Sequence, residues 1–357
     1  MVHRRHCVVP SYILEHIART GTDGQREAAL RTLGRDAVVR RARLRNAAVR
    51  AGGPREGADA LAALTAVPGP QRTITDAQHG ADVTAGPVVR REGDPPTGDP
   101  AADEAYDGFG SVHDFYAAVF SRNSIDDEGM PLRGVVHFGR AYDNAFWDGR
   151  RMVFGDGDGE LFLRFTRSLD VIGHELGHGV IEDEAALEYA GQSGALNEHW
   201  ADVSGTMVKQ RTLGQDVTQA DWLIGAELLA PGVHGVALRS MKAPGTAYDD
   251  PRLGRDPQPD HMSGYVRTLD DDGGVHINSG IPNKAFYEVA SALGGHVWER
   301  AGRIWYETLR HPALRPTATF AQFAGLTWGV ARSLYGDASA EARAVVAGWA
   351  AVGLTVG

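Results

Sequence analysis

The stretch Asp170–His178 constrains this chain more than any other, because it contains the pattern His174-Glu-x-x-His178. The apolar residues around the pattern favour a helix there. On a helix, residues four apart lie on one face, so both imidazoles are able to reach one metal ion. Glu175 directly follows the first histidine and lies beside that ion without being a ligand. Two imidazoles next to a carboxylate are the groups that a zinc hydrolase requires.

A second stretch, Gly194–Asp202, supplies further candidate groups. A catalytic zinc site takes three protein ligands and keeps one position open, and Glu198 is the candidate third ligand. Asp202 lies four residues further along the same helical face. It is a candidate acceptor for the other ring N–H of a zinc-bound histidine. A solvated helix face is the simpler explanation for two acidic residues, but their nearness to the first motif favours catalysis.

Composition sets the size and class of the protein. The chain has 357 residues, of which 43% are hydrophobic and 23% charged, which is typical of a globular protein with two lobes or domains. No apolar run reaches the roughly 20 residues of a membrane span. No apolar signal core follows the basic N-terminus, so we expect a cytoplasmic location at synthesis, with non-classical secretion left open. The single cysteine, Cys7, excludes an internal disulfide.

Charge is distributed unevenly along the chain. Residues 1–55 carry 12 Arg and 4 acidic residues, a net charge of +8, whereas the remainder carries 24 basic and 42 acidic residues, a net charge of −18. A basic arm of this kind is able to bind nucleic acid or an anionic surface. It is equally able to dock on the acidic remainder of its own chain. We favour the second interpretation and expect no nucleic acid among the partners.

The order of the segments predicts an α+β protein. Residues 1–50 are basic and helical, and residues 51–70 are a linker rich in Gly and Pro. Residues 71–180 form a β-rich N-lobe that contains a helix at 103–122 and ends in the metal-binding helix. Residues 181–357 form a helical C-lobe with helices at 196–211, 283–293, 296–310, 319–334 and 339–350. Long connections are expected at 230–270 and 271–282, and short strands at 72–76, 87–91, 134–139, 142–147, 152–154 and 161–163.

Several motifs in this order resemble the thermolysin family of zinc metallopeptidases, and most of all its protealysin-like branch with a short N-terminal prosegment. The resemblance covers roughly residues 72–335. Its motifs are Asn144–Trp147, Gly155–Gly159, His174–His178, Gly194–Glu198, Leu238–Met241 and Gly273–Gly280. It implies a two-lobed fold with the His-Glu-x-x-His helix at the junction of the lobes.

The resemblance also implies a role for each matching residue. Zinc, the one catalytic ion, would be bound by His174, His178 and Glu198. Glu175 would be the general base that takes a proton from the attacking water and passes it to the leaving amine. Tyr189 and His276 would hydrogen-bond the oxyanion, Asp271 would orient His276, and Asp202 would support a zinc-bound histidine. Substrate would contact Asn144, Ala145 and Arg239, and the apolar pocket beside the cut would be lined by Phe162, Phe165, Val171 and Leu238. Taken singly, each of these residues is also explained by packing or by an ordinary surface or loop position.

The same resemblance assigns the two N-terminal segments. Residues 1–50 would be a prosegment that inhibits its own catalytic part, and residues 51–70 would contain the processing region. Cys7 would either add a thiolate to the zinc or pack as a small apolar residue. An apolar pocket would favour cleavage before Leu, Phe, Ile or Val.

The chain departs from thermolysin itself at the double calcium site. Asp170 and Asp221 match two of the acids there, but Lys209, Leu223 and Ala226 fall where others would be. A lysine is unable to ligate Ca²⁺ and repels it. We therefore expect this double site to be absent.

Two other functions stay open at this point. One is a non-catalytic protein with a structural zinc and a basic arm for nucleic acid or an anionic surface. A structural zinc is normally enclosed by four protein ligands, which this chain does not offer. The other is a zinc hydrolase that acts on something other than peptides, against which Arg239 and Asn144 argue. We expect an endopeptidase that hydrolyses peptides or proteins and is made as a self-inhibited precursor.

Overall fold

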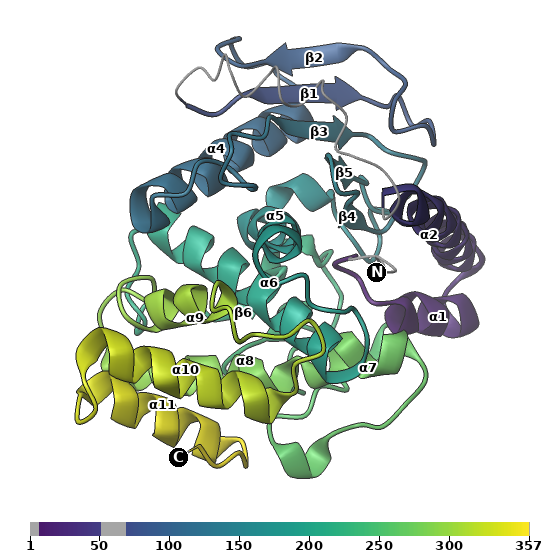
Figure 1. The fold of residues 1–357 in the computed structure, drawn as a ribbon. Coiled ribbons are helices and arrows are strands. Elements are labelled where there is room, and N and C mark those ends of the chain that lie inside the picture. The colour runs from purple at the N-terminus through teal and green to yellow at the C-terminus, as the bar shows by residue number, and fades with distance from the viewer. Residues whose placement is uncertain (1–6, 51–68, 357) are drawn as a thin grey trace. The chain divides into compact units, whose positions relative to one another are not determined.

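The computed structural model describes residues 7–50 and 69–356, and of residues 38–50 only the backbone. Contacts divide the chain into two compact units, unit 1 (Met1–Ser168) and unit 2 (Leu169–Gly357). Figure 1 shows the elements of both units, coloured along the chain. The processing region expected at residues 51–70 lies outside the described residues, apart from residues 69 and 70.

A five-stranded mixed sheet is the frame of unit 1, in the order β2-β1-β3-β5-β4. β1 is parallel to β3 and β3 is parallel to β5, whereas the edge strands β2 and β4 are antiparallel to their neighbours. Short apolar runs between Gly, Asp and Pro produce these strands. Their bounds are β1 (Arg72–Asp76), β2 (Val88–Arg91), β3 (Leu132–Val136), β4 (Ala145–Trp147) and β5 (Met152–Phe154).

Local backbone chemistry explains where the strands differ from expectation. β3 ends at Val136 because His137 takes a left-handed φ of 52°. The described stretch 161–163 forms no strand beyond an isolated bridge residue at Phe162, although the residues are apolar. Oδ1 of Asp158 accepts the backbone N–H of Leu161 at 2.7 Å and of Phe162 at 3.0 Å. These donors are therefore withdrawn from any ladder.

The helix α4 (Pro100–Phe120) packs on β1 and β3 of the sheet. It begins where Asp99 accepts the N–H of Ala101 at 3.1 Å, with Pro100 at the first helical position. It ends at Ser121, whose φ of 56° is left-handed. The expected helix at 103–122 is thus present and begins slightly earlier.

The N-terminal part of unit 1 contains α1 (Ser11–Thr20) and α2 (Asp23–Arg50), which pack against each other and are purple in Figure 1. Before α1, the N–H of Val8 donates to the carbonyl of Ala145 at 3.3 Å, so this segment contacts the edge strand β4. Cys7 packs against a buried apolar cluster. That cluster consists of Ala77, Val135, Phe138, Tyr142, Phe146 and Val153.

Two buried helices, α5 (Leu169–Glu184) and α6 (Gly191–Thr212), form the centre of unit 2. They approach closely because both lack side chains at the contact. A Cβ on Gly205 would lie 2.3 Å from the carbonyl oxygen of Asp170, and one on Gly173 would lie 3.0 Å from the Cα of Gly205. Any larger residue would separate the two helices that carry the zinc motifs.

The remainder of unit 2 is mainly helical, with short two-stranded ladders. Its helices are α7 (Asp271–Asn278), α8 (Gly280–Leu293), α9 (Ala301–Leu309), α10 (Phe320–Tyr335) and α11 (Ala340–Ala351). Its ladders pair β6 (Leu223–Ile224) with β7 (Arg239–Ser240), and β8 (Asp249–Asp250) with β9 (Gly254–Arg255). The core holds Trp305 stacked on Trp349, with ring centroids 6.1 Å apart.

Two helical expectations in unit 2 need correction. Residues 271–282 are not a connection, because α7 and the start of α8 occupy them. The helix expected at 296–310 begins only at Ala301. A sheet in unit 1 and helices in unit 2 make the chain an α+β protein, as expected. Among the described residues, none of the helices combines the length and the apolar character that crossing a membrane requires.

Candidate functional site: a His-His-Glu metal centre

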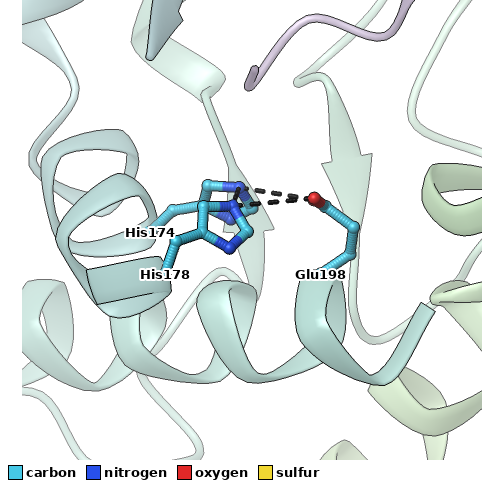
Figure 2. A group of neighbouring side chains, drawn as sticks. All are labelled: His174, His178 and Glu198. Carbon is cyan, nitrogen blue, oxygen red and sulfur yellow. Dashed lines mark hydrogen bonds and ion pairs between the residues drawn. The ribbon is translucent and has the colours of Figure 1, made fainter. Parts of the chain in front are cut away.

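The two histidines of the His-Glu-x-x-His pattern point from α5 toward Glu198 on α6 (Figure 2). The Nε2 atoms of His174 and His178 lie 3.2 Å apart. Glu198 oxygens lie 3.4 Å from the Nε2 of His174 and 3.6 Å from that of His178. One ligand atom from each residue lies within 4.8 Å of the others, and all three side chains are fully buried. The structure thus brings the three expected ligands together.

The hydrogen bonds on the outer side of each imidazole leave its inner nitrogen as a lone-pair donor. The Nδ1 of His174 lies 2.8 Å from Oδ1 of Asp202, and the Nδ1 of His178 lies 2.8 Å from Oδ1 of Asn197. Because both partners are acceptors, each Nδ1 carries a proton, and in the neutral ring that binds a metal each Nε2 faces inward with its lone pair. Two facing lone pairs beside a carboxylate repel one another unless a cation lies between them. The donor set therefore fits zinc.

Tyr189 and His276 reach the same centre from outside the two zinc motifs. The Tyr189 hydroxyl donates to Oε1 of Glu198 and lies 3.2 Å from the Nε2 of His276. That Nε2 lies 3.5 Å from Oε2 of Glu198. On the other side of the ring, the Nδ1 of His276 donates to Oδ1 of Asp271 at 2.6 Å. Asp271 therefore orients His276 as expected.

A left-handed turn aims His276 at the centre. Asp271, Asp272, Gly273 and Gly274 all have positive φ, between 51° and 88°. Aspartate and glycine tolerate this region better than other residues do. The turn lets Oδ2 of Asp271 accept the backbone N–H of His276 at 2.8 Å. The same carboxylate thus holds both the backbone and the ring of that histidine.

Arg239 is held by the carboxylate that supports His174. Its Nε lies 3.0 Å from Oδ2 of Asp202 and its Nη2 lies 2.9 Å from Oδ1. Burial raises the pKa of Asp202, but the charge of Arg239 and the hydrogen bond of His174 outweigh it, and the pKa falls below its usual range. Asp202 is therefore an ionised acceptor. Glu175 lies between the two histidines on α5 and is fully buried.

Charges within the centre also shift the pKa values of its other members. Burial raises the pKa of Glu198, but the charges of His276 and His178 lower it well below the usual range. Burial lowers the pKa of His276, whereas the charges of Glu198 and Asp271 raise it, with a result of about 9. Glu198 is thus an anionic ligand, and His276 is a hydrogen-bond donor at neutral pH.

The residues expected to hold the substrate backbone lie in unit 1, where the N-terminal segment contacts them. Oδ1 of Asn144 accepts the N–H of Val9 at 3.0 Å, and its Nδ2 donates to the carbonyl of Val9 at 3.2 Å. The Nδ2 also donates to Oδ2 of Asp36 at 3.1 Å. The carbonyl of Ala145 accepts from Val8, as described above.

The four residues expected to line the apolar pocket are divided between the units. Phe162 and Phe165 belong to unit 1, with ring centroids 6.0 Å apart. Val171 and Leu238 belong to unit 2. All four are buried.

A lysine takes the place of a cation next to the acids that match the double calcium site. The Nζ of Lys209 lies 3.0 Å from Oδ2 of Asp170 and 3.0 Å from Oδ2 of Asp221. It lies 3.9 Å from Oε1 of Glu227. Burial lowers the pKa of Lys209, but the charges of Asp170, Glu227 and Asp221 more than offset this and keep it protonated.

Sequence reasoning missed residues that support the metal ligands from behind. Asn197 receives the Nδ1–H of His178 and donates to the carbonyl of Leu187 at 3.3 Å. Asn283 donates to Oδ2 of Asp202 at 2.8 Å. The position of Asn197, directly before Glu198 on a buried helix, was the one available signal. Asn283 is remote in sequence and had none.

Comparisons with known proteins agree with this geometry. The family described as "Thermolysin metallopeptidase, catalytic domain" matches residues 71–182, and "Thermolysin metallopeptidase, alpha-helical domain" matches residues 185–354. An extracellular metalloprotease of Pectobacterium carotovorum subsp. carotovorum is 52% identical over 98% of this chain and 96% of its own length. An extracellular minor metalloprotease of Serratia marcescens is 40% identical over 82% of this chain and 79% of its own.

A solved structure is similar over nearly the whole chain. The precursor of protealysin, a metalloproteinase from Serratia proteamaculans, has a TM-score of 0.87 and 47% sequence identity. The similarity covers 98% of this chain and all of that one.

The expected cytoplasmic location was wrong. Two of the relatives are named extracellular proteases, which points to secretion. The expectation rested on the lack of a recognisable signal near the first residue, and that is a weak argument about the final location of a protein.

Proposed function

The chain belongs to the thermolysin family of zinc metallopeptidases, and from this premise we propose what its own residues do in peptide hydrolysis. It is a zinc endopeptidase that is made as a precursor. A non-catalytic zinc protein with a nucleic-acid-binding arm is not supported by these relatives. Docking of the basic segment on its own chain, with no nucleic acid bound, stays our proposal.

The convergence of His174, His178 and Glu198 carries the proposal. Their buried nitrogens and carboxylate would hold the zinc, with Asp202 and Asn197 fixing the two imidazoles from behind. When bound, zinc lowers the pKa of water and polarises a carbonyl group.

Three further side chains would handle protons and charge. Glu175 would accept a proton from the attacking water and donate it to the leaving amine. His276 and Tyr189 would donate hydrogen bonds to the carbonyl oxygen as it becomes negative, and removal of one such donor costs about 10²–10³ in rate. Asp271 would keep His276 in the orientation that makes this possible.

We also propose that the N-terminal segment inhibits the enzyme by taking the contacts of a substrate. Val8 and Val9 use the Asn144 side chain and the Ala145 carbonyl, which are the groups that we expect a substrate backbone to use. A segment whose backbone hydrogen-bonds an edge strand and a side-chain amide uses the kind of contact by which peptides bind to sheet edges. Residues 1–50 would then be the prosegment and 51–70 the processing region, followed by a β-rich lobe at 71–180 and a helical lobe at 181–357.

The apolar side chains Phe162, Phe165, Val171 and Leu238 support a preference for Leu, Phe, Ile or Val after the cut. Apolar side chains favour apolar substrate groups, because a charged group beside them would lose its hydration. Arg239 would hold the substrate carbonyl just past the cut.

The experiment that tests this function compares variants of one helix. The full chain, incubated until it has shortened, is assayed on a peptide with Leu after the scissile bond and on one with Asp in its place. We expect kcat/KM for the Leu peptide to be higher by about 100-fold or more. Glu175→Gln, first shortened by added wild-type enzyme and then purified away from it, should keep its zinc and lose hydrolysis, whereas Glu182→Gln, on the same helix, should keep both. Zinc-loaded Glu175→Gln that hydrolyses the peptide normally would refute the role of Glu175.

A further inference from the structure

A chain of buried hydrogen bonds leads away from the zinc ligand His174 into the core of unit 2. Beyond Asp202, the Nδ2 of Asn283 donates to Oδ2 of that carboxylate at 2.8 Å. The Nδ1 of His199 lies 2.7 Å from Oδ1 of Asn283. The Nε1 of Trp305 donates to the Nε2 of His199 at 2.7 Å. All five residues are fully buried.

Trp305, at the far end of this series of hydrogen bonds, determines which group donates and which accepts at each step. An indole N–H is a donor only, so the Nε2 of His199 must be an acceptor. A neutral imidazole then carries its proton on Nδ1. That N–H donates to Oδ1 of Asn283, which turns the amide so that its Nδ2 faces Asp202. Each group in the chain therefore has one possible orientation.

The near end of the chain is the metal ligand. Asp202 accepts from Asn283 on Oδ2 and from His174 on Oδ1, and Arg239 donates to both oxygens. With Asn283 reversed, its carbonyl oxygen would face the carboxylate and repel it. With the amide as observed, the carboxylate is held in place to accept the Nδ1–H of His174, and the Nε2 of that ring is left for the metal.

We propose that Trp305, His199 and Asn283 are positioning residues for the zinc ligand His174, acting through the hydrogen-bond chain that ends at Asp202. These hydrogen bonds connect α9, α6 and α8 to α5, which carries His174. Three other helices therefore contribute to the orientation of this imidazole. This inference rests on the proposed function, because it requires zinc at His174.

The competing explanation is that these hydrogen bonds merely satisfy buried polar groups, and a measurement of zinc affinity distinguishes the two explanations. If the hydrogen bonds are only structural, breaking one lowers the melting temperature and leaves zinc affinity unchanged. If they position His174, breaking one also weakens zinc binding, because outer partners of metal-bound histidines contribute about 10–100-fold in affinity.

The test measures the zinc dissociation constant by chelator competition, in full-length protein carrying Glu175→Gln to prevent self-cleavage. Trp305→Phe removes the indole N–H and keeps an aromatic ring. We expect it to raise the dissociation constant by about tenfold or more. The visible spectrum of the Co²⁺-loaded protein, which reports ligand geometry, should change as well.

The matched control is Trp200→Phe. Trp200 is buried on α6, and its indole N–H has no hydrogen-bond partner within the described part of the chain. This variant should bind zinc as the parent does. His199→Gln, which keeps one donor and one acceptor, should bind zinc more tightly than His199→Leu. If Trp305→Phe does not fold, the comparison of the two His199 variants tests the positioning role instead.

The outcomes separate the inference from the function on which it rests. Zinc binding by the parent, with equal binding by folded Trp305→Phe or by both His199 variants, overturns the positioning role and leaves the metal site intact. A parent that binds no zinc overturns the proposed function, and the positioning role with it.

Discussion

At the residue scale, the function depends on which atom of each side chain carries a proton. Acceptors behind His174 and His178 leave both Nε2 atoms for the metal. The Nδ1 of His276 donates to Asp271, and the raised pKa of this ring, about 9, keeps a second proton on Nε2 as the donor at the centre. Glu175 is buried on the same helix as the two histidines. Each of these side chains is held by a hydrogen-bond partner or by burial.

Tyr189→Phe tests one of these donors. The change removes a hydroxyl that lies 3.2 Å from the Nε2 of His276 and leaves the ring in place. We expect kcat of the activated enzyme to fall by about 10²-fold or more, with a small change in KM, because the hydrogen bond strengthens in the transition state. Steady-state kinetics on one peptide, with zinc content measured in parallel, will decide. An unchanged kcat would remove Tyr189 from the mechanism.

Much of the ligand set could be predicted from the sequence, since two histidines four residues apart on a helix share one face. The supporting residues could not. A buried Asn such as Asn283 gives no sign of its partner until the fold brings α8 to Asp202. The helix α7 was missed because an Asp-Gly run indicates a loop. Its left-handed turn is stabilised by the carboxylate of Asp271 and by the carbonyl of Asp270, which accepts from Gly273 and Gly274.

At the element scale, two buried contacts lead to separate predictions: Lys209 between two helices of unit 2, and Asp143 beneath α2 of unit 1. Lys209 links α6 to the start of α5 through Asp170, whose carboxylate is fully buried. Asp143 lies beneath α2, where its N–H donates to the hydroxyl of Thr32 at 3.1 Å. The first contact involves acids that match the double calcium site, and the second is expected to make the release of the prosegment depend on pH.

Lys209→Ala should destabilise the protein by roughly 3–5 kcal/mol, because it leaves the buried Asp170 without its cation. Chemical denaturation measures this, with Lys242→Ala, at an exposed position, as the control. For the wild type we expect millimolar Ca²⁺ to leave the melting temperature nearly unchanged. A large rise would show that a calcium site exists after all.

Asp143 should make prosegment release depend on pH. Its carboxylate is buried. Burial and the charge of Asp158 raise its pKa well above the usual range, against the opposing charge of Arg31 on α2. Once α2 leaves, water would lower that pKa. The docked form therefore binds more protons, so docking is strongest at low pH and weakens as pH rises above the pKa of the released form.

The variant Asp143→Asn should remove this dependence. We expect the rate of wild-type self-activation, divided by the peptide-hydrolysis rate of the activated enzyme at the same pH, to rise from about pH 5 to about pH 8. In Asp143→Asn the same ratio should stay nearly flat. Equal slopes for the two proteins would exclude Asp143 as the cause.

At the scale of the whole molecule, the two units carry different parts of the function. Unit 2 contains the metal centre with its supporting residues, and unit 1 contains Asn144, Ala145 and the N-terminal segment that contacts them. Cys7 packs on the apolar cluster of unit 1, so we expect Cys7→Ser to leave the latency of the precursor unchanged. The order of the longer helices and of β1 to β5 was predictable from turn residues and periodicity, whereas α7 and the short strands β6 to β9 were not. The close approach of α5 and α6 was not, because it depends on Gly173 and Gly205 meeting in space.

The most direct test of a self-processing zinc endopeptidase follows the intact mass of the purified precursor over time. Wild type and Glu175→Ala are compared, each with and without a zinc chelator. We predict that wild type loses an N-terminal segment of several kilodaltons, while Glu175→Ala and the chelated samples stay whole. Shortening of Glu175→Ala at the wild-type rate would contradict the account, as would zinc-loaded wild type that neither shortens nor cleaves an added peptide.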